Sequence, residues 1–282
     1  MKLKMVIPKG RIYTKVAELL DEIGIKLRGS DRSYRPNCSD LALEVKLLKS
    51  QNIPPLLALG QHDIGFAGLD WIIEQDATVD CLLDLKFDPV KLICAVPESS
   101  DWSEMKQRKL IAVSEYRRIS ENYLKQQGID YTFVRAYGAT EVFPPEDGDL
   151  IIDNTSTGST LVANNLKIVD TVMQSTTQFI ANPTSLENPD KRDKVENMIR
   201  LMQSVLSGRQ RVLLEMNCTS EALEKVVALL PSMRAPTVSE LYLQSGFAVK
   251  SAVPKVEVNA LIPELIKAGA SDILETQIRK IL

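Results

Sequence analysis

The chain has 282 residues, a length that predicts about two domains at roughly 150 residues each. Its 34 basic and 37 acidic residues give a net charge of −3, while 44% of the residues are apolar and 25% are charged. This composition is typical of a soluble globular protein and excludes the collagenous, broadly disordered and disulfide-scaffold classes. The acidic balance also argues against general nucleic-acid binding, because binding to a phosphate backbone requires a basic face.

The rare residues restrict the chemistry further. The single histidine, His62, excludes a His-rich metal site, and its place in the turn-like string at 60–63 indicates a loop residue. The four cysteines form no C-x-x-C motif, which favours a reduced, intracellular protein without a zinc or redox motif. No apolar run approaches 18 residues, and the N-terminal apolar run is too short for a signal peptide. We therefore expect a cytoplasmic protein with no membrane span.

Strands and helices alternate along the chain up to Gly208. Hydrophobic periodicity predicts strands at 3–7, 41–47, 64–67, 90–96, 110–113, 131–135 and 150–152. It predicts helices at 12–23, after Pro54, and at 71–75, 117–127, 161–166 and 191–206. Asp70 is expected to be the N-cap of the helix at 71–75. The alternation predicts an α/β fold whose sheet is covered on both faces.

A new unit begins after Gly208. Its predicted order is a strand at 211–216, a helix ending at Leu230, strands at 237–241 and 247–253, a helix at 259–268 and a strand at 273–281. This βαββαβ order is that of a ferredoxin-like domain. The unit carries no obvious nucleophile or phosphate loop, so it is either a structural, dimerising module or a small-molecule sensor.

The most informative segment covers residues 150–161, where a buried strand ends in Asp153 and a hydroxyl-rich loop leads into a helix. Such a loop suits a ribose 5-phosphate, because Gly158 lets backbone N–H groups close on an anion at a helix start. Asp153 is placed to accept hydrogen bonds from vicinal ribose hydroxyls, at the strand end where open α/β sheets bind ligands. The alternative is a hydroxyl-rich turn before a capped helix, with no ligand.

The spacing D-x-x-x-T-G-x-T-L in this segment resembles the loop that binds phosphoribosyl pyrophosphate (PRPP) in phosphoribosyltransferases. Members of that group that use nucleobases usually carry an acidic pair here, whereas this chain has Asp153 followed by Asn154.

Two glycine-containing strings favour a phosphorylated ligand as well. Lys9 and Arg11 flank a glycine between a strand and a helix, where they can neutralise a pyrophosphate or triphosphate; a solvated turn is the alternative. Gly65 and Gly68 allow the backbone to approach a ligand closely, or allow tight packing of a strand on a helix.

Together these strings resemble the ATP phosphoribosyltransferases, in the long form of that family. The matching segments are P-K-G-R-hydrophobic at 8–12, the glycine- and aspartate-spaced string at 60–70, Glu-Val at 141–142, S-T-G-x-T-L at 156–161, and further strings at 164–166, 180–183, 235–239 and 268–274. The similarity spans almost the whole chain. One departure is local: the segment before the loop aspartate is shortened to residues 148–152.

The resemblance implies a catalytic body of two periplasmic-binding-protein-like (type II) α/β lobes and a C-terminal ferredoxin-like βαββαβ domain. The first lobe would comprise residues 1–88 and 175–207, and the second, with the PRPP loop, residues 89–174. The regulatory domain would comprise residues 208–282. The chain would therefore cross between the lobes near Asp88 and again near Ser175.

The implied reaction joins ATP and PRPP to give N1-(5-phosphoribosyl)-ATP and pyrophosphate, the first step of histidine biosynthesis. Adenine N1 attacks the anomeric carbon as pyrophosphate leaves, and Mg²⁺ arrives with PRPP. The resemblance also implies feedback inhibition by histidine and a homo-oligomer, either a dimer or a hexamer. The competing interpretations are a two-lobed binding or effector protein without catalysis, a catalytically silent regulatory subunit, and a nucleobase phosphoribosyltransferase.

The candidate site residues follow from the motifs and from the resemblance. The catalytic candidates are Lys9, Arg11, Glu141 and Asp153. PRPP is expected to contact Asp153, Asn154, Thr155, Ser156, Thr157, Gly158, Ser159 and Thr160. ATP or pyrophosphate is expected to contact Lys9, Gly10, Arg11, Gly68 and Asp70. Histidine is expected to contact Asn217, Thr237 and Ser271. No metal ion held by protein ligands alone is expected.

Overall fold

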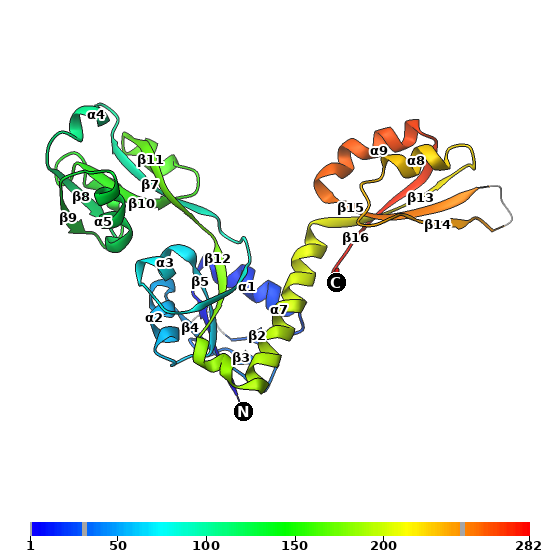
Figure 1. The fold of residues 1–282 in the computed structure, drawn as a ribbon, viewed down its shortest axis with the longest axis horizontal. Helices are drawn as coiled ribbons and strands as arrows, with labels where there is room; N and C mark the ends of the chain where they lie inside the picture. The colour runs from blue at the N-terminus through cyan, green and yellow to red at the C-terminus, as the bar shows by residue number, and fades with distance from the viewer. Residues whose placement is uncertain (1, 30–32, 243–245) are drawn as a thin grey trace. The chain divides into compact units, whose positions relative to one another are not determined.

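The computed structural model describes residues 2–29, 33–242 and 246–282 (Figure 1). The chain divides into two compact units, the first comprising Met1–Asp21 and Ile25–Lys194 and the second comprising Glu22–Gly24 and Val195–Leu282. Helix α7 (Pro189–Arg209) contributes residues to both units. Within the described residues, no helix is long and apolar enough to cross a bilayer.

The first sheet of the first unit has the strand order β4-β1-β5-β12-β6. Its strands are β1 (Leu3–Pro8), β4 (Leu43–Leu48), β5 (Ile64–Gly68), β6 (Asp80–Asp84) and β12 (Thr177–Ala181). The same part of the chain contains the helices α1 (Arg11–Glu22), α2 (Ile53–Ala58) and α3 (Leu69–Glu74). It also contains the short paired strands β2 (Leu27–Arg28) and β3 (Asn37–Cys38). Strand β1 is parallel to β4 and β5, whereas β12 is antiparallel to β5 and β6. We call this part the first lobe.

The second sheet of the same unit has the order β11-β7-β10-β8-β9. Its strands are β7 (Val90–Pro97), β8 (Leu110–Ser114), β9 (Tyr131–Arg135), β10 (Leu150–Thr155) and β11 (Leu166–Ser175). Its helices are α4 (Trp102–Met105), α5 (Arg117–Gln126) and α6 (Ser159–Ala163). Because β8 is parallel to both β9 and β10, the carboxyl ends of these three strands share one edge. We call this part the second lobe.

Two stretches of chain connect the lobes. The first runs from the end of β6 at Asp84 to the start of β7 at Val90, and the second from the end of β11 at Ser175 to the start of β12 at Thr177. Strands β7 and β11 are antiparallel neighbours, with Ser175 opposite Val90, and they run side by side in Figure 1. The second lobe is therefore inserted between two strands of the first, which confirms the predicted two-lobed α/β body.

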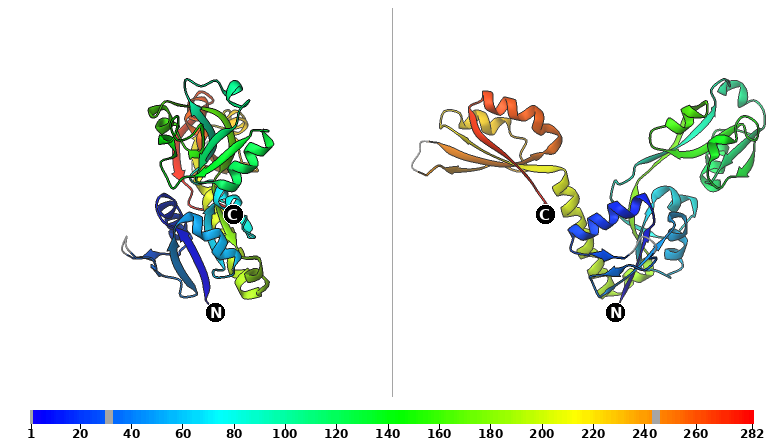
Figure 2. Two further views of the ribbon diagram at one scale, coloured as in Figure 1. Left: turned by 90° about the vertical axis from the view of Figure 1, so that its left-hand side faces the viewer. Right: turned by 180° about the vertical axis from the view of Figure 1, so that it is seen from behind.

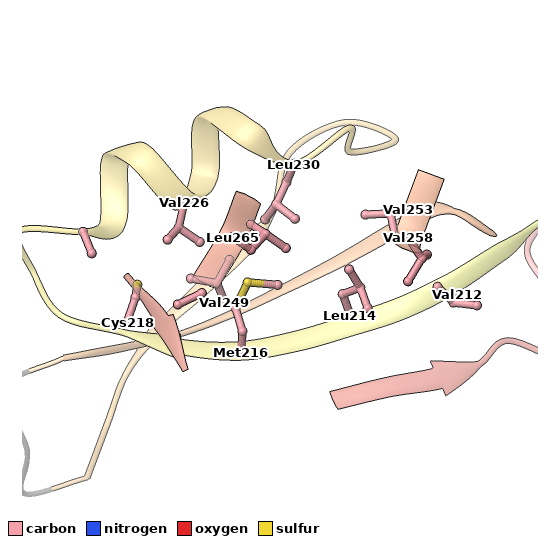
Figure 3. Packing of buried hydrophobic residues seen from close by; sticks show 12 residues of the cluster. Val212, Leu214, Met216, Cys218, Val226, Leu230, Val249, Val253, Val258 and Leu265 are labelled. Carbon is pink, nitrogen blue, oxygen red and sulfur yellow. The ribbon is translucent and has the colours of Figure 1, made fainter. Parts of the chain in front are cut away.

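The second unit contains an antiparallel sheet of order β14-β15-β13-β16. Its elements are β13 (Arg211–Cys218), α8 (Leu223–Leu229), β14 (Thr237–Glu240), β15 (Phe247–Pro254), α9 (Val258–Lys267) and β16 (Ala270–Gln277). Helices α8 and α9 lie on the same face of the sheet (Figures 1 and 2). In Figure 3, Val226 of α8 points toward Met216 and Val249 of the sheet, within one buried apolar cluster. The predicted ferredoxin-like βαββαβ domain is confirmed.

One predicted cap is wrong. Gly68 is the N-cap of α3, and Asp70 lies inside the first turn of that helix with only 6% of its surface exposed. Its carboxylate bonds instead to side chains of other segments, those of Tyr116 and Ser175.

Candidate active site

The carboxyl edge of the second sheet carries the predicted ribose-binding residue. Three buried residues of β10 lead directly to Asp153, which is partly exposed. The Asp153 Oδ2 atom accepts a hydrogen bond from the hydroxyl of Thr140, and Oδ1 accepts one from the backbone N–H of Asn154 at 2.6 Å. Thr140 is fully buried at the start of the short helix η2 (Thr140–Val142). The carboxylate is therefore held in one orientation near the end of β10, two residues before the strand ends at Thr155.

Electrostatics at this edge raise the pKa of Asp153 above its ordinary value. Burial is the main cause, and the negative charge of Glu141 in η2 acts in the same direction. The hydrogen bonds from Thr140 and from the Asn154 backbone oppose the shift because they stabilise the charged form. Glu141 and Asp153, two predicted catalytic residues, are thus close enough to influence each other.

The loop after Asp153 presents hydroxyl groups to solvent. Thr155 Oγ1 accepts the backbone N–H of Gly158 at 2.9 Å, which closes the loop. Gly158 is the N-cap of α6 with φ of +76°, a left-handed conformation that favours glycine. The hydroxyls of Thr157 and Ser159 lie 3.0 Å apart. Residues exposed along the loop are Ser156, Thr157, Ser159 and Thr160. Such a cluster of donors can bind a phosphate.

The predicted cations come from the turn between β1 and α1. Arg11 begins α1, and its Nε lies 3.2 Å from Asp88 Oδ1, an oxygen that also bonds to Lys15 Nζ at 3.0 Å. Asp88 belongs to the first of the two stretches that connect the lobes. The Lys9 ammonium lies 3.3 Å from the centre of the Tyr34 ring, a cation–π contact. Arg11 remains two-thirds exposed, so its guanidinium is accessible to an anion.

A cavity of about 170 Å³ is lined by residues from both lobes. The first lobe contributes Arg11, Gly68 and Asp70 to its lining, and the second contributes Tyr116 and Asn154. Four of the predicted substrate contacts therefore meet around one space. Lys9 and Gly10 line a different cavity of about 270 Å³, together with Tyr13, Gly29, Ser33, Pro36 and Leu47.

Asp70 is fully engaged by hydroxyl groups. Its Oδ2 accepts a hydrogen bond from Tyr116 Oη at 2.9 Å, and its Oδ1 accepts one from Ser175 Oγ at 2.7 Å. Tyr116 Oη in turn accepts a hydrogen bond from Asn154 Nδ2 at 2.9 Å. Burial, with the nearby charge of Asp70, raises the pKa of Tyr116, so its phenol stays protonated.

The sequence reasoning missed several residues of this site. Tyr116 and Glu115 directly follow the predicted strand at 110–113, so the rule used for Asp153, that ligands bind at strand carboxyl ends, would have identified them. The pKa of Glu115 is raised, first by burial and then by the charge of Asp153, which indicates that the two carboxyl groups lie close together. Thr140 and Ser175 carry no comparable signal in the sequence.

The donor set does not form a protein-held metal site. Among the described residues there is no group of three or more His, Cys, Asp or Glu placed to hold a metal ion. At the second sheet's edge, Asp153 already accepts two hydrogen bonds from the protein. The described residues therefore offer no set of protein ligands that would hold a magnesium ion without a substrate.

Comparison with known proteins agrees with this geometry. The family model described as "ATP phosphoribosyltransferase" matches residues 49–204, and the model described as "HisG, C-terminal domain" matches residues 208–280. The ATP phosphoribosyltransferase of Chlorobium phaeobacteroides is 39% identical over 99% of this chain and 97% of its own length. That of Pelotomaculum thermopropionicum is 38% identical over the full length of both chains.

The chain belongs to the ATP phosphoribosyltransferase family. It is thus a transferase of histidine biosynthesis with the C-terminal domain of the long form, as its sequence motifs indicated. A solved chain of the ATP phosphoribosyl transferase (HisG:HisZ) complex from Thermotoga maritima is similar with a TM-score of 0.65 and 26% identity. The similarity covers 98% of that chain but 73% of this one.

The C-terminal domain of this family member carries the residues predicted to bind histidine. Asn217 and Ser271 are cross-strand partners, and both donate hydrogen bonds to Asp272 Oδ2, at 3.0 and 3.1 Å. Thr237 lies on the edge strand β14 opposite Lys250, on the sheet face away from the helices. The structure therefore brings Asn217 and Ser271 together, leaves Thr237 two strands away, and adds Asp272, which the sequence reasoning missed.

Proposed function

We propose that this protein transfers the phosphoribosyl group of PRPP to N1 of ATP, giving N1-(5-phosphoribosyl)-ATP and pyrophosphate. The proposal rests above all on one observation: Arg11 and Asn154 line the same cavity, and Asn154 directly follows Asp153. A cation suited to a pyrophosphate thus lines the same cavity as the neighbour of a carboxylate suited to ribose hydroxyls.

PRPP binds along residues 153–160 in this proposal. Asp153 accepts hydrogen bonds from the ribose hydroxyls, because its carboxylate lies near the end of β10 and is already oriented by Thr140. The exposed hydroxyls of Thr157, Ser159 and Thr160, with backbone N–H groups around Gly158, bind the 5-phosphate. Asn154, Thr155 and Ser156 complete the loop, and Thr155 keeps it closed.

Charge placement supports the transfer step. As the bond to pyrophosphate breaks, positive charge develops on the ribose ring and negative charge on the leaving group. Asp153 and Glu141 stabilise the first, and Arg11 stabilises the second through its exposed guanidinium. Bringing adenine N1 and the anomeric carbon together supplies the remaining acceleration, so that no covalent nucleophile is required.

The ATP phosphates and the leaving pyrophosphate share the turn between β1 and α1. Lys9 and Gly10 line the cavity beside this turn, whereas Arg11 and Gly68 line the cavity between the lobes. Asp70 orients the hydroxyls of Tyr116 and Ser175 in this proposal, since both of its carboxylate oxygens accept hydrogen bonds from them. Mg²⁺ bound to PRPP would supply positive charge against the pyrophosphate, and Arg11 would supply the positive charge on the protein side.

Histidine, in this proposal, inhibits the enzyme by binding to the C-terminal domain at Asn217, Ser271 and Thr237. Asp272 strengthens the case, because its carboxylate lies beside Asn217 and can pair with the α-ammonium group of an amino acid. We also propose that the protein works in the cytoplasm as a homo-oligomer, a dimer or a hexamer.

The decisive experiment mixes the purified protein with ATP, PRPP and Mg²⁺ and measures phosphoribosyl-ATP and released pyrophosphate. Both products should appear in equal amounts, and neither should appear when ATP or PRPP is left out. Absence of product from protein shown to be folded, together with tight binding of another solute, would contradict the proposal.

A further inference from the structure

The two lobes meet where α3 of the first lobe contacts the start of α5 in the second. The rings of Trp71 and Tyr116 are 4.6 Å apart between centroids. The Glu74 carboxylate accepts the backbone N–H groups of Arg118 at 3.2 Å and of Ile119 at 3.1 Å, so a side chain of one lobe caps a helix of the other. This junction is therefore built from specific, largely buried contacts.

A chain of hydrogen bonds crosses the junction and ends beside Asp153. It runs from Ser175 through Asp70 and Tyr116 to Asn154. The direction of each bond is fixed by chemistry, because an ionised carboxylate only accepts and an amide nitrogen only donates. Tyr116 must then donate to Asp70 and accept from Asn154. Ser175, Asp70 and Tyr116 are 3%, 6% and 1% exposed, so water competes little with the bonds among these three, whereas Asn154 at the end of the chain is exposed.

We infer that Tyr116 is a positioning residue for PRPP. Its hydroxyl holds the side chain of Asn154, and thereby the strand end that carries Asp153, in a position set by Asp70 of the first lobe. The lobe that supplies Arg11 then also determines where the ribose-binding carboxylate lies. The inference rests on the proposed function and gives Tyr116, which lines the cavity, the role of orienting Asn154 and the neighbouring Asp153.

Packing alone does not account for this tyrosine. The ring already stacks on Trp71, and a phenylalanine would fill the same volume without burying a hydroxyl. The hydroxyl is retained at a fully buried position, where one of its hydrogen bonds reaches Asp70 of the first lobe and the other holds Asn154 of the second. Displacements of about 1 Å at a reacting centre can lower the rate about 100-fold. Holding Asp153 in place can therefore outweigh the free-energy cost of burying the Tyr116 hydroxyl.

The same helix provides a matched control. Tyr123 of α5 also donates its hydroxyl to a carboxylate at 2.9 Å, that of Asp170, but both residues belong to the second lobe. Tyr116→Phe and Tyr123→Phe therefore remove the same chemical group and the same kind of hydrogen bond from one helix. Only the first removal breaks the connection to Asn154 and Asp70.

The test compares both variants with the wild-type full-length protein. Tyr116→Phe should raise KM for PRPP about tenfold or more while KM for ATP changes about threefold at most, because one charge-assisted bond and the orientation of Asn154 are lost. Tyr123→Phe should leave both KM values within about twofold of wild type, since its bond does not reach the site. Melting temperatures show whether the two variants lose similar stability.

The inference is overturned if Tyr116→Phe keeps the wild-type KM for PRPP, or if Tyr123→Phe shifts it equally. Calorimetric titration of PRPP into each protein separates this outcome from failure of the proposed function. If the wild type binds PRPP without turnover, the proposed reaction is wrong, and about tenfold weaker binding by Tyr116→Phe would still support the positioning role. If the wild type does not bind PRPP, both proposals fail.

Discussion

Asp153 is partly exposed to solvent, yet it is buried enough to change its pKa. Its side chain lies near the end of β10, where burial and the neighbouring charge of Glu141 raise its pKa. Both causes make the ionised form less favourable in the folded protein than in the unfolded chain. Ionisation of Asp153 therefore opposes folding as the pH rises, which is typical of a side chain placed for chemistry rather than for stability.

Asp153→Asn should separate these two properties. We expect kcat/KM for PRPP to fall about 100-fold or more, because a neutral amide stabilises the positive ribose ring poorly. The free energy of unfolding should change by about 1 kcal/mol at most, since the amide oxygen still accepts from Thr140. Steady-state kinetics and urea unfolding of the same preparation provide the comparison. Equal losses of activity and stability would contradict the assignment.

Thr140→Val should shift the profile of kcat/KM for PRPP against pH. The Thr140 hydroxyl stabilises the carboxylate and lowers the pKa of Asp153, so its removal raises that pKa further. PRPP use requires the ionised form, and therefore the acid limb of kcat/KM against pH should move to higher pH.

Glu141→Gln should shift the pKa of Asp153 in the opposite direction, because it removes a negative charge that raises this pKa. The acid limb of this variant should move to lower pH. Identical limbs in the wild type and both variants would show that Asp153 does not control the profile.

At the scale of single residues, sequence reasoning identified groups by their position after a strand. This rule led to the prediction for Asp153 and the loop to Thr160, because one buried run and one glycine define that segment. It was incomplete for Asp70, whose capping role was wrong and whose partners lie 46 and 105 residues away. No local pattern reports such distant hydroxyl partners, so the connection to Tyr116 required the tertiary structure.

At the scale of elements, α5 shows how one lobe stabilises the other. The helix has Tyr116 at its N-cap, whose side chain makes no capping hydrogen bond. The carboxylate of Glu74 from α3 takes over this task and also places a negative charge at the positive end of the helix dipole. The first turn of α5 therefore depends on a residue 43 positions before the helix begins.

Glu74→Ala should lower the free energy of unfolding by about 2 kcal/mol, because it leaves two N–H groups at the junction without their acceptor. Glu121→Ala is the matched control, since Glu121 pairs with the exposed Arg117 on the surface of the same helix. That change should cost about 0.5 kcal/mol. Urea unfolding measures both values, and similar losses would argue against an interlobe cap.

The elements that the sequence predicted well have regular periodicity, and those it missed do not. The ten-residue strand β11 was not predicted, because its pairing with β7 shifts register between Ile168 and Asp170 and again between Thr171 and Met173. Each irregularity interrupts the two-residue alternation by which a strand is recognised. Strand β12 was missed for another reason: it is buried at every position although it begins with Thr177 and Gln178.

At the scale of the whole molecule, the C-terminal unit is not confined to the predicted domain 208–282. The compact unit begins within α7 at Val195, and Ser204 of this helix accepts the backbone N–H of Ile281. Truncation after Gly208 would therefore remove packing partners from α7 as well as the candidate histidine site. Single substitutions in the full chain test regulation more cleanly.

Asp272→Asn should raise the histidine concentration for half-maximal inhibition about tenfold or more, because it removes the charge proposed to pair with the α-ammonium group. Glu275→Gln removes the same charge from the same strand, but its pairing with the buried Leu214 puts it on the opposite face of the sheet. That variant should keep the wild-type response. Inhibition curves at fixed ATP and PRPP decide the matter, and an unchanged curve for Asp272→Asn would place the histidine site elsewhere.

The pairing of Val90 with Ser175 has a consequence for how this architecture can be rebuilt. The second lobe leaves and rejoins the first through adjacent points, and beyond those points Asp84 of β6 is already paired with Gln178 of β12. A short hairpin turn could join these two strands directly, at a small cost in loop-closure entropy. The second lobe is thus an insertion between two adjacent antiparallel strands of the first lobe, β6 and β12. A different sheet with similarly spaced ends could be grafted in its place without altering the strand order of its host.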